Sequence, residues 1–297
     1  MRKTLLIAAG LLLGSAAFVV VFLTQILSAI GLHPHYARQD FDLAGQRALI
    51  IATNHGTLGD PKDGVAPGVY GSELTIAYYE FLDAGMTVDI ASIDGGKIPF
   101  EPAGHRWPLA TTADYRFLGD VAAQAKTDQS LRIADIDVTT YGIVFMAGGR
   151  GAAYDLGVSA ELGETITRAH AAGILLGSVC HGVLGFLMAS DIDGSPLVEG
   201  RTMTGVTDKQ VAELGIGITP QHPETELRAR GANFVSATAF RDFFATHVAV
   251  DGNIVTGQNQ NSTGETAQTL LAMLAAREAD PSKSEKTASI PGSSHDQ

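Results

Sequence analysis

Short apolar runs and amphipathic segments alternate along most of the chain. Runs of mostly apolar residues, typical of buried strands, occur at residues 47–54, 86–92, 141–149 and 173–179. Residues 72–85 and 158–171, which lie between such runs, carry apolar side chains at the spacing of one helix face. Strands that alternate with helices predict a doubly wound α/β fold, in which a mostly parallel sheet is flanked by helices.

The C-terminal part of the domain adds more strands and a final helix. Residues 231–236 and 247–257 are predicted strands, and the second turns like a hairpin at Asp251-Gly252-Asn253. Residues 262–279 are predicted to form the last helix.

The first 32 residues differ from the rest of the chain. After Arg2 and Lys3, nearly thirty residues contain only Thr, Ser and Gln as polar side chains. Roughly 20 apolar residues cross a bilayer as a helix, so we predict one uncleaved N-terminal transmembrane helix. The preceding positive charges place the N-terminus in the cytoplasm and the catalytic domain outside it. The alternative is a cleaved signal that leaves a secreted or periplasmic protein, but no clear cleavage site follows the apolar run.

These patterns divide the chain into four segments. Residues 1–32 are the predicted anchor, 33–46 a polar linker and 47–279 the α/β domain. Residues 280–297, rich in Ser, Lys and Pro, are predicted to be disordered.

Charge and cysteine content exclude several classes of function. The net charge is −12, so no excess of Lys or Arg is present to neutralise nucleic-acid phosphates. The single cysteine excludes an internal disulfide and a zinc site built from cysteines. The histidines lack metal-ligand spacing, and we predict neither a metal nor a cofactor.

Three features fall at the carboxyl ends of predicted strands, where open parallel sheets bind their ligands. They are Glu73, the turn Gly148-Gly149, and Cys180 with His181 behind it. A strand that runs at once into a helix places Cys180 on a sharp turn beside helix amides, in the manner of a nucleophile elbow. A helix terminus and a protonated histidine both stabilise a thiolate, so we expect a lowered thiol pKa. The alternative is a cysteine buried only for packing.

Several strings together resemble the ThiJ/PfpI superfamily, and more narrowly its glyoxalase III and heat-inducible chaperone branch. The resemblance covers about residues 46–276 and is carried by "APGVYGSE", "FMAGGRGAAYDL", "GSVCHG", "PLVEGRTMTGVTDK" and "VDGNIVTGQNQNS". It implies a class I glutamine amidotransferase-like, flavodoxin-like sandwich. Many members of this superfamily are dimers, so the resemblance also implies a possible homodimer.

The resemblance also implies roles for individual residues. Cys180 matches the nucleophile, His181 the adjacent histidine and Glu73 the carboxyl group beside the thiolate. Gly148 and Gly149, with the backbone of His181, match the oxyanion pocket.

Two positions depart from the family pattern. Relatives often have Gly-Gly-His-Gly where this chain has Arg150 after the glycines. The acidic third member of the triad falls on Val211, and Glu213 or Asp208 could replace it after a small shift of register.

The leading functional hypothesis is a glutathione-independent glyoxalase that converts methylglyoxal, a small carbonyl substrate, to lactate. Cys180 would add to the aldehyde, and Glu73 or His181 would move the proton. The second hypothesis is a cysteine hydrolase, namely a peptidase, amidase or protein deglycase. The third is a membrane-anchored stress chaperone or redox sensor without turnover.

Overall fold

The computed structural model describes residues 14–15, 18–19, 22–23, 25–56 and 67–279. One sheet of seven strands has the spatial order β3-β2-β1-β4-β5-β9-β8. These strands are β1 (Arg47–Ala52), β2 (Thr87–Ser92), β3 (Leu131–Arg132), β4 (Ile143–Met146), β5 (Leu175–Val179), β8 (Val248–Asp251) and β9 (Ile254–Gly257). A separate pair consists of β6 (Thr202–Met203) and β7 (Asn233–Phe234). Every pairing in the large sheet is parallel except β8 with β9. This topology confirms the predicted α/β fold with a mostly parallel sheet.

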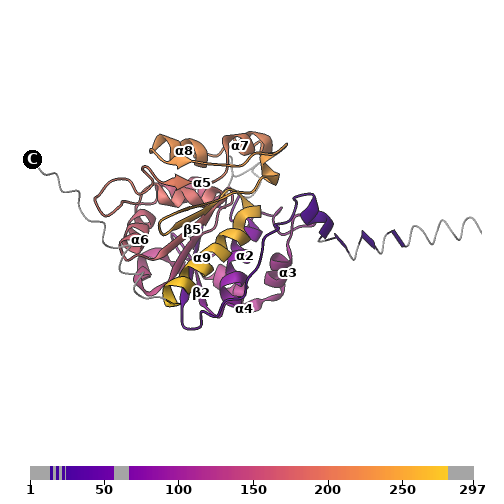
Figure 1. The fold of residues 1–297 in the computed structure, drawn as a ribbon, viewed down its shortest axis with the longest axis horizontal. Coiled ribbons are helices and arrows are strands. Elements are labelled where there is room, and N and C mark those ends of the chain that lie inside the picture. The colour runs from indigo at the N-terminus through magenta and orange to yellow at the C-terminus, as the bar shows by residue number, and fades with distance from the viewer. Residues whose placement is uncertain (1–13, 16–17, 20–21, 24, 57–66, 280–297) are drawn as a thin grey trace, which may run out of the picture.

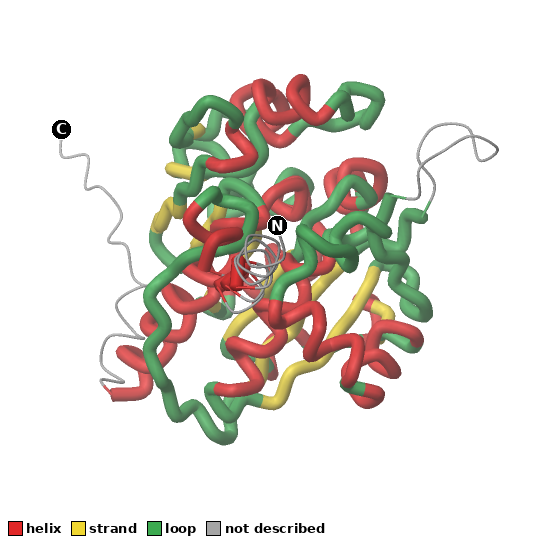
Figure 2. The backbone as a smooth tube through the Cα atoms, turned by 90° about the vertical axis from the view of Figure 1, so that its right-hand side faces the viewer, coloured by secondary structure: helices red, strands yellow, loops and turns green. Residues whose placement is uncertain are grey.

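Helices cover both faces of the large sheet (Figures 1 and 2). The α-helices are α2 (Gly71–Asp83), α3 (Thr112–Gly119), α4 (Val121–Asp128), α5 (Ala152–Asp155), α6 (Ala160–Ala171), α7 (Asp208–Leu214), α8 (Pro223–Ala229) and α9 (Thr263–Ala279). The 3-10 helices are η1 (Ile133–Asp135), η2 (Val138–Thr140), η3 (Leu156–Val158), η4 (Cys180–Phe186), η5 (Asp242–Phe244) and η6 (Gln260–Ser262).

The core consists of two apolar layers, one on each face of the sheet. Successive side chains of a strand point to opposite faces. In β1, Ile50 packs with α2 and α9, whereas Leu49 and Ile51 pack with α5, α6 and η4. All three side chains are fully buried. The register pairs Ala52 of β1 with Ser92 of β2, so the two strands end at the same edge of the sheet.

The stretch predicted as a linker lies against the domain. Its Tyr36 hydroxyl donates a hydrogen bond to Glu80 of α2 (2.7 Å). Gln268 of α9 donates to the other oxygen of the same carboxylate (2.5 Å). The backbone N–H of Gln39 donates a hydrogen bond to the Gln268 side chain (2.8 Å). Residues 33–43, called the strap below, therefore join α2 to α9.

The predicted membrane anchor at residues 1–32 is not supported. Much of it, namely residues 1–13, 16–17, 20–21 and 24, lies outside the described residues. Among the residues that are described, no helix has the length and apolarity needed to cross a bilayer. The last helical turn of this segment packs on the domain, because Leu27 is buried and Asn261 donates a hydrogen bond to the Gly31 carbonyl (2.9 Å). These findings contradict the predicted anchor and the localisation that depended on it. The tail at 280–297 also lies outside the described residues.

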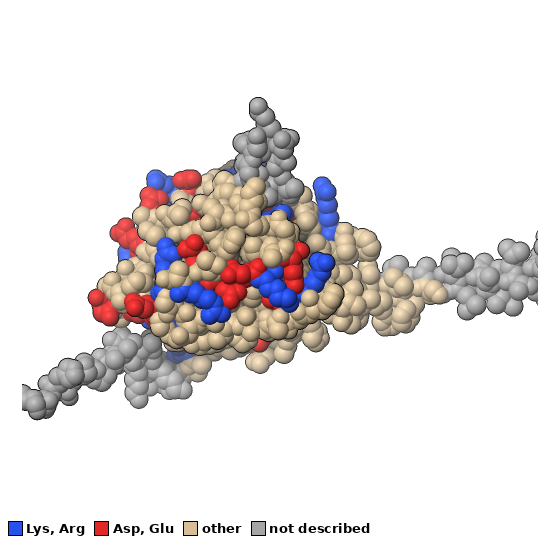
Figure 3. All heavy atoms as spheres, turned by 90° about the horizontal axis from the view of Figure 1, so that it is seen from above, with Lys and Arg blue, Asp and Glu red and all other residues tan. Residues whose placement is uncertain are grey.

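Acidic and basic side chains alternate on the outer face formed by α7 and α8. Ion pairs one helical turn apart join Lys209 to Glu213, Arg228 to Glu224 and Arg230 to Glu226. In the view from above, Lys and Arg lie beside Asp and Glu rather than in separate patches (Figure 3). Exposed pairs of this kind contribute little to stability, so this face owes its folding to the apolar layer beneath it.

Candidate active site

Cys180 stands directly after the central strand β5, on a strained turn. Its backbone φ is 57°, and it is the only non-glycine residue with positive φ in the described part of the chain. The left-handed region is costly for a side chain with a Cβ, and such strain gathers at functional sites. The turn leads at once into η4, so the local geometry is the predicted elbow that presents a side chain at the edge of the sheet.

The glycine turn after β4 lets neighbouring segments close around the thiol. A Cβ on Gly148 would lie 2.6 Å from the Glu73 carboxylate and 2.7 Å from the Val179 carbonyl, which is too close for any side chain. Gly149 has a φ of 99°, which favours glycine. The structure therefore brings the predicted Gly148-Gly149 turn together with Glu73 and the end of β5.

Glu73 lies in the first turn of α2 and is 1% exposed. One of its oxygens, Oε2, has no hydrogen-bond partner. Burial raises the pKa of this carboxyl well above its usual value, and hydrogen bonds with the Cys180 thiol and the Gly148 amide oppose that rise only in part. Glu73 therefore resists ionisation.

The same burial acts on the sulfur. Burial first, and then the adjacent Glu73, raise the pKa of the Cys180 thiol, while hydrogen bonds from the Gly149 and His181 amides lower it. The expected lowering of the thiol pKa is therefore wrong, because loss of solvent around the sulfur outweighs the amides. Both groups therefore keep their protons to a higher pH than they would in water. In the state with one proton shared between them and that proton on Glu73, the sulfur is ionised and accepts hydrogen bonds from both amides.

His181 touches the sulfur but is not protonated. Its Nδ1 lies 3.4 Å from Cys180 Sγ, and the residue is 2% exposed. Burial, with smaller contributions from the positive charges of His222 and Arg150, lowers the pKa of His181 to about 3. The imidazole is therefore neutral at neutral pH, contrary to the expected cation.

The two carboxylates proposed as a third triad member point elsewhere. Glu213 accepts a hydrogen bond from the Asp242 N–H (2.8 Å), and Asp208 accepts one from the Thr225 hydroxyl (2.8 Å). Neither forms an ion pair with His181 in the described structure. The Nε2 atom of His181 is buried and unpartnered, as is Nε2 of His222, the N-cap residue of α8. After burial, His222 makes the largest contribution to the lowered pKa of His181.

A buried ion pair beside the thiol was missed by sequence reasoning. The Glu101 carboxylate accepts hydrogen bonds from the backbone N–H of Arg150 (2.6 Å) and from its Nε (2.8 Å), and its oxygen lies 2.7 Å from Nη2. Arg150 was noted only as a departure from the family pattern. The sequence around Glu101 carries no motif, and only the contact with Arg150, 49 residues further on, reveals its place.

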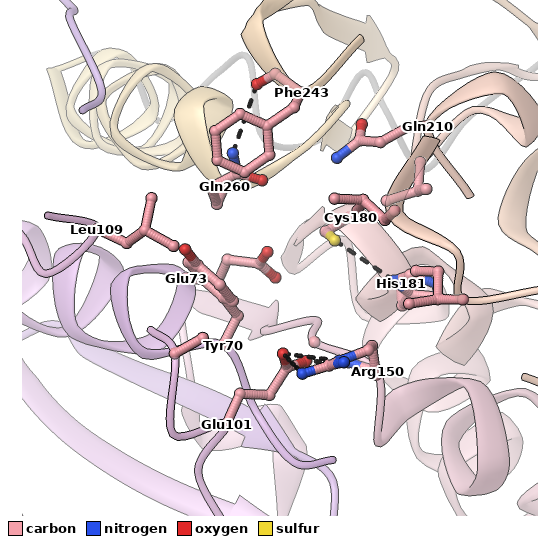
Figure 4. Close-up of a pocket in the computed structure, with 15 residues that line it drawn as sticks. Tyr70, Glu73, Glu101, Leu109, Arg150, Cys180, His181, Gln210, Phe243 and Gln260 are labelled. Atoms are coloured by element: carbon pink, nitrogen blue, oxygen red, sulfur yellow. Dashed lines mark hydrogen bonds and ion pairs between the residues drawn. The ribbon is translucent and has the colours of Figure 1, made fainter. Parts of the chain in front are cut away.

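These residues surround one cavity of about 220 Å³ (Figure 4). Cys180, Glu73 and His181 meet there, as do Arg150 and Glu101. Segments far apart in the sequence complete the lining, including Leu109, Gln210, Phe243 and Gln260. A thiol, a proton-holding carboxyl, a neutral imidazole and two amides in one small cavity can perform nucleophilic addition to a carbonyl group, followed by proton transfer.

Comparisons with known proteins agree with this geometry. The model of the DJ-1/PfpI family matches residues 64–273. Glyoxalase 3 of Candida albicans is 30% identical over 221 residues, covering 71% of this chain and 91% of the relative. A glutathione-independent glyoxalase of Schizosaccharomyces pombe is 29% identical, covering 76% and 94%. The crystal structure of a 24 kDa rapid encystment protein of Francisella tularensis superposes with a TM-score of 0.71 at 26% identity, covering 77% of this chain and 99% of that one.

Proposed function

This chain belongs to the DJ-1/PfpI family, and from that membership and the site geometry we propose that it is a glutathione-independent glyoxalase that converts methylglyoxal and water to lactate. The observation that carries the proposal is the position of Cys180 with Glu73 and His181 in one cavity. The relatives named as glyoxalases support the choice of substrate.

The first step forms a bond between sulfur and carbon. With the shared proton on Glu73, the Cys180 thiolate attacks the aldehyde carbon, and the electron pair of the C=O bond moves to oxygen. The amides of Gly149 and His181, which face the sulfur, stabilise that oxyanion. Glu73 then donates its proton to the oxygen, which gives a hemithioacetal and leaves a carboxylate at Glu73.

The second step moves one proton between neighbouring carbons. The Glu73 carboxylate removes the proton from C1, and the electrons of that C–H bond form a C1=C2 double bond while the C2 oxygen takes the hydroxyl proton of the C1 oxygen. Glu73 then returns its proton to C2, and the C1–O bond becomes a carbonyl. This isomerisation yields a thioester of lactate without any change in net oxidation state. Burial suits Glu73 to the task, because a carboxyl with a raised pKa accepts and releases protons near neutral pH.

The last step releases the product. Neutral His181 accepts a proton from a water molecule that attacks the thioester carbonyl and passes it to the Glu73 carboxylate. The carbon–sulfur bond then breaks, lactate leaves as the free acid, and the sulfur regains its thiolate form. Burial of the thiol inside a small cavity favours turnover of a small bound molecule over a redox sensor, whose thiol should be exposed.

Lactate formation from methylglyoxal without added glutathione tests the proposal. We expect the full chain to form lactate and Cys180→Ala to form none above the uncatalysed rate. Ser195→Ala, at a half-buried turn residue outside the cavity lining, serves as the control and should keep the wild-type rate. Lactate formation by Cys180→Ala, or its absence in the wild type together with cleavage of peptide or amide substrates, would refute the proposal.

A further inference from the structure

The cavity around Cys180 has two unlike parts. Arg150 and Glu101 lie at the bottom of the close-up, whereas Phe243 lies at the top beside Gln210 and Gln260, and Leu109 lies at the left (Figure 4). Away from the ion pair, the lining is mostly apolar, because Val206, Leu214 and Ile216 also belong to it. A small aldehyde bound to the sulfur leaves most of this apolar lining in contact with water, which is unfavourable.

The guanidinium of Arg150 is already paired with the Glu101 carboxylate. Both oxygens of Glu101 are engaged by Arg150, one by the backbone N–H and the other by Nε and Nη2. Such a two-pronged pair satisfies the carboxylate and neutralises the guanidinium. Among the described residues that line the cavity, Arg150 is the one Lys or Arg, so none of them offers a free cation to a substrate carboxylate or phosphate.

Gln210 supplies a further polar contact. It is 1% exposed and lines the same cavity as Cys180 (Figure 4). Its side-chain oxygen is buried without a hydrogen-bond partner. An amide buried without partners is costly unless a ligand satisfies it, and it can both donate to a carbonyl oxygen and accept from a hydroxyl group.

We propose that the cavity selects 2-oxoaldehydes whose substituent is apolar and larger than methyl, with the Gln210 side-chain N–H donating to the second carbonyl oxygen and Oε1 accepting from the hydroxyl group of the hemithioacetal. This inference rests on the proposed glyoxalase function and narrows its substrate class. The aldehyde carbon lies at the sulfur, the ketone oxygen at Gln210, and the substituent extends along Leu109, Ile216 and Phe243. Each methylene group buried there increases affinity by roughly fourfold.

Three substrates test the inference on the full-length protein. They are methylglyoxal, 4-methyl-2-oxopentanal, which has a branched apolar substituent, and 4,5-dioxopentanoate, which has nearly the same size but ends in a carboxylate. We expect kcat/KM for 4-methyl-2-oxopentanal to exceed that for methylglyoxal by about tenfold or more, because three further carbons are buried. The carboxylate substrate should fall below methylglyoxal. Equal values for the two large substrates, or a preference for the carboxylate, would overturn the inference.

Two variants locate the preference. Leu109→Asn preserves size but makes the apolar wall polar, so the ratio of kcat/KM for 4-methyl-2-oxopentanal over methylglyoxal should fall toward one. Leu118→Asn, a half-exposed leucine on α3 away from the cavity, is the matched control and should keep the ratio. A ratio unchanged in Leu109→Asn contradicts the proposed path of the substituent.

Gln210→Leu tests the polar contact. Removing an unpaired buried amide should raise the melting temperature, whereas kcat/KM should fall about tenfold for every 2-oxoaldehyde, mainly through KM. A merely structural glutamine would not combine higher stability with lower affinity. Unchanged KM in a folded Gln210→Leu variant would overturn the role of Gln210.

A binding measurement separates this inference from the proposed function. Cys180 is the single cysteine, so its alkylation by iodoacetamide reports occupation of the cavity alone. If no substrate is turned over but 4-methyl-2-oxopentanal protects Cys180 better than 4,5-dioxopentanoate, the glyoxalase reaction is refuted and the apolar selectivity stands. If methylglyoxal is converted to lactate but protection shows no such preference, the glyoxalase reaction stands and the apolar selectivity is refuted.

Discussion

Helix α2 carries two buried glutamates, two turns apart, with opposite surroundings. Glu80 near its C-terminal end receives hydrogen bonds from Tyr36 and Gln268, and Arg38 Nε lies 3.3 Å from its carboxylate. Glu73 at the N-terminal end has the Cys180 thiol as a neighbour and keeps Oε2 without a partner. One carboxylate is fully satisfied by the strap and α9, and the other is left incomplete beside a nucleophile.

The difference separates a structural carboxylate from a chemical one. Partners that hold a buried charge in place stabilise the fold but leave it no capacity for a substrate. A carboxyl without enough partners costs stability and has its pKa raised, which makes it able to exchange a proton. The residue type and the helix are the same, so the surroundings alone assign the two roles.

The largest expected effect is on catalysis by Glu73→Gln. The amide still fills the space and can donate a hydrogen bond to the sulfur, but it cannot carry a proton. We expect kcat for lactate formation to fall by roughly 10²- to 10⁴-fold, with the fold retained by circular dichroism. Activity within a factor of three of wild type would show that Glu73 is not the proton carrier.

Glu80→Gln should give the complementary result. An amide at this position turns an N–H toward the donors of Tyr36 or Gln268 and loses the charge that faces Arg38. The free energy of unfolding, measured by denaturant titration, should fall by about 1–3 kcal/mol, while kcat for methylglyoxal stays at the wild-type value. A loss of kcat without a loss of stability would show that Glu80 acts in the reaction rather than in the fold.

The pH dependence of stability should identify Glu73 as well. The folded protein keeps Glu73 protonated above the usual carboxyl pKa of 4.5, so above that pH it binds more protons than the unfolded chain. The free energy of unfolding therefore falls as pH rises through this range, by at most about 1.4 kcal/mol per pH unit from this group. Glu73→Gln should remove that slope, whereas Glu164→Gln, which removes an exposed carboxylate on α6, should not. Equal slopes in the two variants would contradict the raised pKa.

The smallest expected effect comes from Tyr36→Phe in the strap. The change removes one hydroxyl and leaves Glu80 with Gln268 and Arg38, so it should lower the free energy of unfolding by about 1 kcal/mol. Activity should not change. Combined with Glu80→Gln, the two losses should not add, because both variants remove the same hydrogen bond. Full additivity in this double-mutant cycle would show that Tyr36 and Glu80 act independently.

The sequence was sufficient where the pattern is local. Strands β1, β2, β4 and β5 and helices α2, α6 and α9 follow from apolar spacing within a few residues of their predicted bounds. The turn at Cys180 followed from a buried strand that meets a glycine-rich segment without a linker. The strand pair β6–β7 and the short helices α7 and α8 were missed in part. These elements are only two to seven residues long, which is too short to show a clear periodicity of apolar positions.

The electrostatics of the site could not be predicted in the same way. The direction of the thiol pKa depends on how completely α2, β4 and the loop before Arg150 exclude water, which no local pattern records. Phe243 and Gln260 enter the cavity from the C-terminal part of the chain, and Glu101 from a loop without periodic spacing. Such residues become visible only when the path of the backbone brings them to one edge of the sheet.

The left-handed backbone conformation at Cys180 has a consequence for the evolution of this position. Glycine adopts this conformation freely, so exchanging the cysteine for glycine should relieve strain while it abolishes the nucleophile. Selection for activity therefore retains cysteine at this position, although its replacement by glycine would make the protein more stable. In relatives that no longer carry out the reaction, residue 180 should be among the first positions to change. A glycine there would mark a protein that has lost the catalytic activity.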